Sequence, residues 1–153
     1  MSAMKDQLRA DLTTSIKARD QMRSSTLRMV LTAITTLEVS GKEARDVTDD
    51  EVLTVLGSEV KKRREAAEAF ATGNRPEMAA KEVAEAAILA EYLPVQMTAE
   101  EISGIVTAAI ESTGSAGEGM RAMGKVMGMV SAQTKDKADS GALAAEVKRQ
   151  LGA

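Results

Sequence analysis

Hydrophobic positions recur along the chain at the spacing of a helix. Apolar residues return every third or fourth position with charged or polar residues between them, as at Met4, Leu8, Leu12 and Ile16, a pattern typical of an amphipathic helix. Seven such segments can be read, so the spacing predicts an all-α protein with helices at about residues 4–18, 22–39, 49–72, 76–92, 99–113, 123–130 and 140–151.

Start and stop signals sharpen several of these boundaries. Thr48 to Glu51 and Thr98 to Glu101 both fit the capping box, in which a Thr hydroxyl and a Glu carboxylate satisfy two orphan amides. Gly73-Asn74 predicts the end of one helix, and Pro76 suits the first turn of the next. The first two helices are expected to form an antiparallel hairpin.

The segment Pro94 to Met97 predicts a hinge between two helical parts. The expected organisation is an N-terminal helical domain of about four helices over residues 1–93 and a compact three-helix C-terminal domain over residues 94–153. A β architecture is disfavoured because Phe70 and Tyr92 are the only aromatic residues.

Composition narrows the class of protein. Apolar residues make up 44%, charged residues 28%, and the formal net charge is −3, a profile typical of a soluble globular chain. No run of about 18 uncharged apolar residues occurs, and the first twenty residues lack the apolar core of a signal peptide. The chain has no cysteine, as expected in a reducing compartment. We therefore expect a cytoplasmic protein without a membrane partner.

Several kinds of catalytic site are excluded by what the sequence lacks. Without histidine or cysteine there is no Ser-His-Asp or Cys-His arrangement and no ordinary zinc site. The segment Gly119 to Lys125 spells the first seven positions of a P-loop, but Val126 stands where Ser or Thr must bind Mg²⁺. The sequence thus predicts no catalytic site of its own, no cofactor and no metal site.

The basic run Lys61-Lys62-Arg63-Arg64 is interpreted as structural. Successive helical residues lie about 100° apart, so the four side chains spread around the helix. Glu59 precedes Arg63 by four residues, and two similar pairs follow, which favours a solvated, salt-bridged face. Neither part is basic overall, since residues 1–92 hold 14 Lys or Arg against 16 Asp or Glu, and residues 93–153 hold 6 against 7. Duplex DNA is not expected as a partner.

The C-terminal part offers the best candidate binding site. Lys125, Lys135 and Lys137 lie around the sixth helix, and Lys148 with Arg149 lie on the last. Gly124 and Gly128 are one helical turn apart, so that stripe is bare backbone. Spacing alone favours close packing by a neighbouring helix. The functional alternative is an RNA backbone whose phosphates contact the lysines.

Methionine is unusually frequent, with ten residues in the chain. Met120, Met123 and Met127 follow helical spacing and could form an adaptable groove for a protein partner. Filling a core that has almost no aromatic side chains is the favoured interpretation. The same scarcity of aromatics argues against binding single-stranded nucleic acid by base stacking.

Three segments together resemble a known family. They are Ser25-Thr26-Leu27-Arg28-Met29, the stretch from Lys62-Arg63-Arg64-Glu65 through Phe70 and Gly73, and Glu91-Tyr92-Leu93-Pro94 with Gln96. In this order and spacing they resemble the YqeY-like family of small bacterial proteins, and the likeness runs over nearly the whole chain.

The C-terminal part carries a second resemblance. Gly124-Lys125-Val126-Met127-Gly128-Met129-Val130, with Lys135, Lys137-Ala138-Asp139 and Val147, is similar to the tail domain of the B subunit of glutamyl- and aspartyl-tRNA amidotransferases. That resemblance implies tRNA or the amidotransferase as a partner, but not the amidotransferase active site. The family usually has Gly where this chain has Asp136, which adds a negative charge between two of the lysines.

The leading hypothesis is a non-catalytic, tRNA-associated accessory protein. RNA would bind the C-terminal helices, with Lys125, Lys135 and Lys137 as phosphate contacts and Gly124 and Gly128 allowing close approach. The alternative is a protein-interaction module that binds a partner subunit or helix through faces rich in Met and Leu.

Overall fold

The computed structural model describes residues 2–152 and is all-α over that range. Seven α-helices and one short 3-10 helix occur there, without a β-strand, which confirms the predicted fold class. The chain divides into two compact units, one ending at Leu93 and one beginning at Pro94. Each unit is described by itself.

The helices lie close to the predicted ranges. The fourth ends two residues earlier than predicted, and the sixth is preceded by a 3-10 turn, Gly119–Ala122. No helix among the described residues is long and apolar enough to cross a bilayer. The bounds are α1 Ala3–Lys17, α2 Gln21–Glu38, α3 Asp49–Thr72, α4 Pro76–Ala90, α5 Ala99–Thr113, α6 Met123–Gln133 and α7 Ser140–Gln150.

Both predicted capping boxes are present. The Glu51 amide donates to Thr48 Oγ1 at 3.2 Å, and the Thr48 amide donates to Glu51 Oε2 at 2.9 Å. Thr98 and Glu101 repeat the arrangement at 3.1 and 3.0 Å. A hydrogen bond from Arg45, with help from the Thr48 amide, lowers the pKa of Glu51 to about 2. The starts of α3 and α5 are therefore fixed locally.

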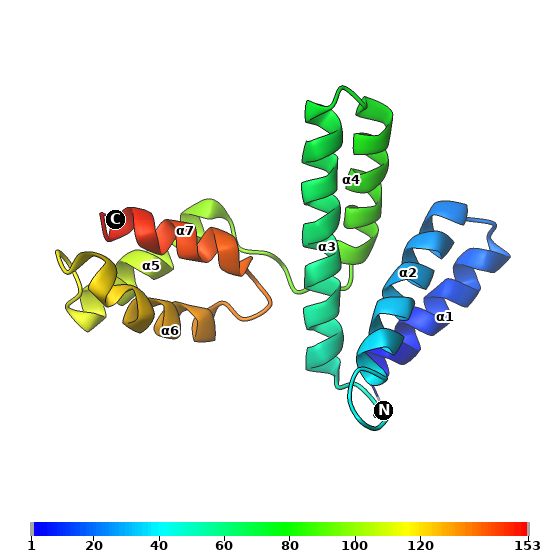
Figure 1. The fold of residues 1–153 in the computed structure, drawn as a ribbon, viewed down its shortest axis with the longest axis horizontal. Coiled ribbons are helices and arrows are strands. Elements are labelled where there is room, and N and C mark those ends of the chain that lie inside the picture. Colours follow the sequence, from blue (N-terminus) through cyan, green and yellow to red (C-terminus); the bar gives the residue numbers. More distant parts are fainter. Residues whose placement is uncertain (1, 153) are drawn as a thin grey trace. The chain divides into compact units, whose positions relative to one another are not determined.

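The N-terminal unit consists of two helical hairpins, α1 with α2 and α3 with α4 (Figure 1). All four helices contribute to one core, where apolar side chains recur at helical spacing. In Figure 1 the ends of α3 and α4 near their connecting loop extend beyond the other hairpin. The buried core residues are Leu8, Leu27, Val30, Ile34, Val47, Val52, Leu56, Val60, Ala86 and Leu89.

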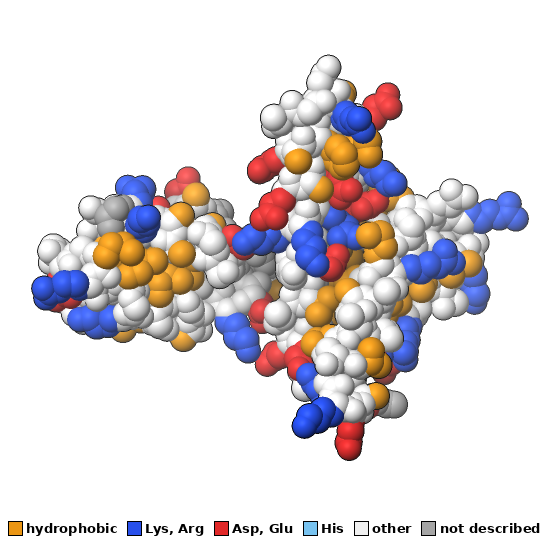
Figure 2. Space-filling model, viewed as in Figure 1, with side chains coloured by type: hydrophobic (Ala, Val, Ile, Leu, Met, Phe, Trp, Pro, Cys, Tyr) orange, Lys and Arg blue, Asp and Glu red, His pale blue; other side chains and the backbone are white. Residues whose placement is uncertain are grey.

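Apolar side chains also remain on the surface of both units (Figure 2). Several are methionines, whose flexible thioethers suit adaptable contacts as well as core filling. The most exposed large apolar residues include Met22, Met29, Val83, Val95, Met120 and Met129.

The interpretation of Lys61 to Arg64 as a solvated face is wrong for Arg63. Its side chain is only 4% exposed, with Nη1 2.7 Å from Glu59 Oε2 and Nε 3.3 Å from Glu85 Oε2. Its Nη2 also lies 3.5 Å from the sulfur of Met29. The predicted pair with Glu59 exists, but Arg63 is a buried link between α3, α4 and α2. The other three residues of the run are exposed.

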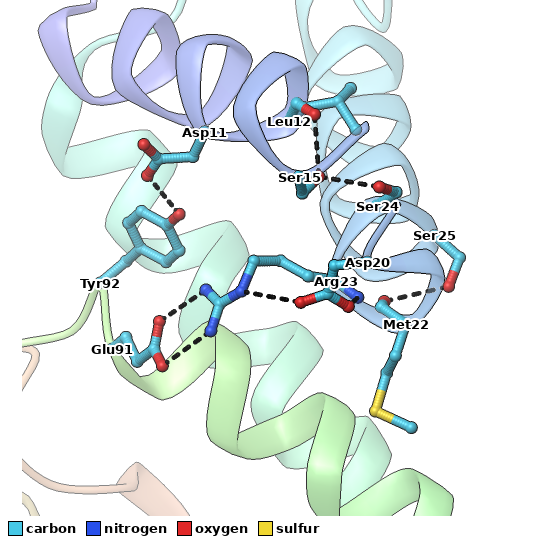
Figure 3. Close-up of polar contacts among 10 residues, drawn as sticks. All are labelled: Asp11, Leu12, Ser15, Asp20, Met22, Arg23, Ser24, Ser25, Glu91 and Tyr92. Atoms are coloured by element: carbon cyan, nitrogen blue, oxygen red, sulfur yellow. Dashed lines mark hydrogen bonds and ion pairs between the residues drawn. The ribbon is translucent and has the colours of Figure 1, made fainter. Parts of the chain in front are cut away.

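Polar contacts join the end of α4 to the first hairpin (Figure 3). The Tyr92 hydroxyl donates to Asp11 Oδ2 at 2.5 Å, and Arg23 binds the Glu91 carboxylate through two nitrogens at 2.8 and 3.1 Å. The hydrogen bonds from Arg23 lower the pKa of the Glu91 carboxyl. Part of the Glu91 to Pro94 segment that resembles the family thus closes the N-terminal unit.

The C-terminal unit is a three-helix bundle with its own core. Val126 and Val130 of α6 pack with Ala122, with residues of α5 and with residues of α7. Ser115, Thr134 and small side chains fill the remaining space near the ends of the helices. The buried core residues are Ile102, Val106, Ala109, Ile110, Ala122, Val126, Val130, Leu143, Val147 and Leu151.

The junction between the units is short. Glu91 and Tyr92 are bonded within the N-terminal unit. Gln96 Nε2 donates to the carbonyl oxygens of Pro94 and Asp136, and the Met97 amide donates to the Lys137 carbonyl at 2.8 Å. Only a few residues therefore lie between Tyr92, which is bonded within the N-terminal unit, and Gln96, which is bonded within the C-terminal unit.

Candidate functional site

The face of α6 opposite the core is bare backbone. Ala122, Val126 and Val130 are buried at a spacing of four residues, which leaves Gly124 and Gly128 on the exposed side. A Cβ placed on either glycine would meet no atom within 4 Å. Among the described residues no neighbouring helix packs on this stripe, so the interpretation favoured from spacing alone is wrong.

Lys125 borders this glycine stripe. Its side chain is 52% exposed, and its Nζ lies 3.8 Å from a Glu118 carboxylate oxygen that is also exposed. An exposed ion pair at this distance is worth at most about 1 kcal/mol. Lys125 can therefore exchange Glu118 for another anion at little cost.

Lys135 and Lys137 lie in the turn that follows α6. Thr134 is buried and caps the helix end by donating from Oγ1 to the Val130 carbonyl at 2.8 Å. The Lys137 amide donates to the Thr134 carbonyl, and Gln96 and Met97 hold the far side of the turn. Both lysines are exposed. Their backbone is thus fixed while their side chains face solvent.

Asp136 sits between them in a left-handed conformation, with φ of 61°. Glycine adopts this conformation without a steric penalty, whereas a residue with a Cβ does not. The geometry explains why a glycine suits this position. In the sequence, an acidic residue thus stands between the two lysines.

The structure does not gather the three lysines at one point. Lys125 is near the start of α6 and Lys135 is beyond its end, so the helical rise separates them by about 15 Å along the axis. This arrangement suits an extended anionic ligand better than a single small anion.

The two cations of α7 differ in their partners. Arg149 donates to Glu146 through Nε at 2.9 Å and Nη2 at 2.6 Å. Hydrogen bonds from Arg149, then Gln150, lower the pKa of Glu146 to about 2. Lys148 is exposed, and its side chain makes no hydrogen bond or ion pair within the described residues. Arg149 is committed to this local pair.

The methionines of α6 and the preceding turn divide between two environments. Met123 and Met127 pack against the core, as the favoured interpretation predicts. Met120 and Met129 are instead 53% and 36% exposed. Core packing therefore accounts for only part of this methionine cluster.

Two features concern the acidic residues and the P-loop-like segment of the described chain. No group of three or more Asp and Glu there is arranged to hold a metal ion. The segment Gly119 to Lys125 forms a 3-10 turn that runs into α6, rather than a loop between a strand and a helix. The segment therefore resembles a P-loop in sequence but not in structure.

Comparison with known proteins identifies the family of this chain. The sequence pattern described as "Yqey-like protein" matches residues 5–151. The chain belongs to the YqeY-like family. A relative is also found in Schizosaccharomyces pombe, where the uncharacterised protein C22F3.15 is 36% identical over 88 residues, 57% of this chain and 69% of that protein.

Some residues that carried the resemblance to the YqeY-like family make contacts between distant parts of the chain. Arg63 and Met29 touch each other, although they belong to segments more than thirty residues apart. Gln96 holds the turn that carries Lys135 and Lys137, a contact that no local sequence signal predicted. These contacts depend on how helices and turns meet, which spacing along one helix cannot report.

Proposed function

We propose that the C-terminal unit binds RNA, tRNA in particular, and that the protein is a non-catalytic accessory factor of tRNA metabolism. The open face of α6 carries the proposal, because Gly124 and Gly128 have free space above them and the exposed Lys125 beside them. A sugar-phosphate backbone can approach such a stripe closely and neutralise its charge on the lysines.

The lysines beyond α6 extend this surface. Lys135 and Lys137 are exposed on a turn whose backbone is held in place. Phosphate contacts of this kind position a nucleic acid without reading its sequence. The similarity of this stretch to the tail domain of the amidotransferase B subunit favours tRNA as the ligand, and the amidotransferase itself as a candidate protein partner.

The test is the affinity of the full chain for bulk tRNA at several salt concentrations. We expect the logarithm of the binding constant to fall linearly with the logarithm of salt concentration. The triple variant Lys125→Ala, Lys135→Ala and Lys137→Ala should reduce that slope by about 2 to 3, because each lost phosphate contact removes one counterion-release event.

Two controls make the result specific. A second triple variant, Arg9→Ala, Lys42→Ala and Arg64→Ala, removes the same charge from exposed positions of the N-terminal unit and should retain most of the affinity. Duplex DNA of similar length should bind more weakly than tRNA. Equal losses in the two triple variants, or no binding at low salt, would refute the proposal.

One observation favours a second function. We call the surface formed by Gly124, Gly128, Lys125, Lys135 and Lys137 the lysine face. Met120 and Met129 expose apolar surface in the same unit, which suits a protein partner. In that case binding of a purified amidotransferase would survive high salt and be lost in Met120→Ser with Met129→Ser. The lysine variant would then leave the complex intact.

A further inference from the structure

The turn between α1 and α2 carries a surface hollow that the lysine face does not involve. Its volume is about 490 Å³, and residues from both helices contribute to it. None of the lining residues is acidic. They are Ile16, Arg19, Gln21, Ser24, Ser25 and Arg28, and we call this site the arginine hollow.

Arg19 and Arg28 line the arginine hollow from different elements, Arg19 from the turn and Arg28 from α2. Both residues are exposed, and within residues 2–152 neither side chain makes a hydrogen bond or an ion pair. The shared lining shows that they border the same space. A guanidinium without a carboxylate partner remains available to another anion.

The acidic side chains nearest this turn are engaged by Arg23. Asp20 accepts from the Arg23 amide at 3.0 Å and lies 3.8 Å from its guanidinium, while Glu91 binds the same guanidinium at 2.8 Å. In Figure 3, Ser25 points away from Arg23 and Glu91. Both carboxylates are thus engaged by Arg23, and that of Asp20 also caps the first turn of α2.

The backbone fixes the position of Arg19. Its φ is 58°, and the turn is closed by bonds from the Arg19 amide to the Ile16 carbonyl and from the Asp20 amide to the Ser15 carbonyl. Glycine is the usual residue at such a left-handed helix end. The backbone conformation of Arg19 is unfavourable for a residue with a Cβ, and the arginine side chain plays no part in closing the turn.

The serines make the floor of the arginine hollow rigid. Ser24 is buried, and its hydroxyl lies 2.8 Å from the Ser15 hydroxyl, which joins α2 to α1. The Ser25 hydroxyl donates to the Met22 carbonyl at 3.1 Å. Because Ser25 is exposed, its hydroxyl can leave this carbonyl and turn toward a ligand. Figure 2 shows Lys and Arg side chains spread along the α1–α2 hairpin, including at its outer end.

From these contacts we infer that the arginine hollow binds a phosphate group. Two guanidinium forks offer paired N–H donors that match phosphate oxygens. On release from the Met22 carbonyl, the Ser25 hydroxyl supplies a further donor. The inference is independent of the proposed RNA face, which belongs to the other unit.

The experiment is a titration of the ¹⁵N-labelled full chain with inorganic phosphate at constant ionic strength. We expect saturable shifts at the amides of Gln21, Ser24 and Ser25, competition by sulfate and none by chloride. The double variant Arg19→Gly with Arg28→Ala should weaken binding about tenfold or more, because both charge-assisted contacts are lost.

Folding and charge are controlled separately. Arg19→Gly places the preferred residue in a left-handed conformation, so the variant should keep its fold, and the melting temperature checks this. Arg9→Ala removes one exposed charge from α1 at a distance of about 15 Å along the helix and should leave phosphate binding unchanged.

Two ligands distinguish the source of the phosphate. A short RNA with a 5′-hydroxyl offers only phosphodiesters, whereas a mononucleotide offers a phosphate monoester. Shifts at the same amides with either ligand, lost in the double variant, support the site and identify which chemistry it accepts. The absence of saturable shifts with all three probes, or identical binding by the double variant, would overturn the inference.

Discussion

Asp136 shows how one residue links stability to the candidate site. Its left-handed backbone disfavours the turn that carries Lys135 and Lys137, and its carboxylate disfavours the binding of a phosphate to those lysines. We expect Asp136→Gly to stabilise the C-terminal unit by about 1 kcal/mol, because glycine removes the Cβ penalty. Amide hydrogen exchange of α6 and α7 measures this change.

A second substitution at this position distinguishes the effect of backbone conformation from the effect of charge. Asp136→Asn removes the negative charge but keeps a Cβ, so it should leave stability nearly unchanged and raise tRNA affinity as much as Asp136→Gly does. If Asp136→Gly lowered the protection of α6, the left-handed geometry would not be the source of strain.

Arg63 is a charged residue whose loss should strongly destabilise the N-terminal unit. Arg63→Met leaves the nearly buried carboxylates of Glu59 and Glu85 without their shared cation, although Lys62 and Lys81 lie 3.2 and 4.0 Å from them. We expect the free energy of unfolding to fall by about 3 kcal/mol. Denaturation by urea measures it.

Its neighbour provides the matched control. Arg64 is exposed, so Arg64→Met should change the free energy of unfolding by less than about 0.5 kcal/mol. Adding Glu85→Gln to Arg63→Met should recover part of the loss, because one uncompensated charge is removed. Equal effects of the two methionine variants would contradict a structural role for Arg63.

At the scale of the element, α6 is expected to trade stability for binding. Glycine inside a helix costs roughly 0.5 to 1 kcal/mol relative to alanine, and nothing packs on Gly124 or Gly128. Gly124→Ala with Gly128→Ala should therefore stabilise the C-terminal unit and weaken tRNA binding, since the backbone is no longer bare. Thermal unfolding and tRNA affinity are measured on the same samples.

Gly104 of α5 offers the matched control. It is also an exposed glycine within a helix, and a Cβ placed there would meet no atom within 4 Å. Gly104→Ala should stabilise the unit without changing tRNA affinity. A double variant of α6 that binds tRNA as tightly as the original chain would show that close approach at this stripe is not required.

The helices themselves were readable from sequence, because each depends on local signals. Apolar spacing located all seven, and the capping boxes at Thr48 and Thr98 gave the starts of α3 and α5. The basic run was misread at Arg63, since its burial depends on Glu85, a residue of the next helix. Pattern along one helix does not report which face another helix covers.

The candidate site was readable only in part. Glycine spacing and lysine positions were visible, but not whether a helix covers Gly124 and Gly128. The left-handed turn at Asp136 and its contact with Gln96 also needed the fold. The arginine hollow was missed entirely, because Arg19 and Arg28 belong to separate segments that meet only at the hairpin turn.

At the scale of the whole molecule, we expect residues 94–153 to fold without the rest of the chain. All ten buried core residues of this unit lie between Ile102 and Leu151. A core in about 60 residues gives marginal stability, so cooperative unfolding at a modest temperature is the expected result. Circular dichroism and dispersed amide resonances of the fragment check it, and a random-coil spectrum would show that the unit depends on its neighbour.

The short junction at Pro94 gives the molecule a property that neither unit has alone. If both proposed sites bind RNA, a ligand held at one of them meets the other at a raised effective concentration, because few residues join the two units. One RNA long enough to reach both the lysine face and the arginine hollow would be held by avidity, exceeding either single affinity without any new contact. Lengthening the junction with a flexible insert should then weaken long RNAs while leaving short ones unaffected.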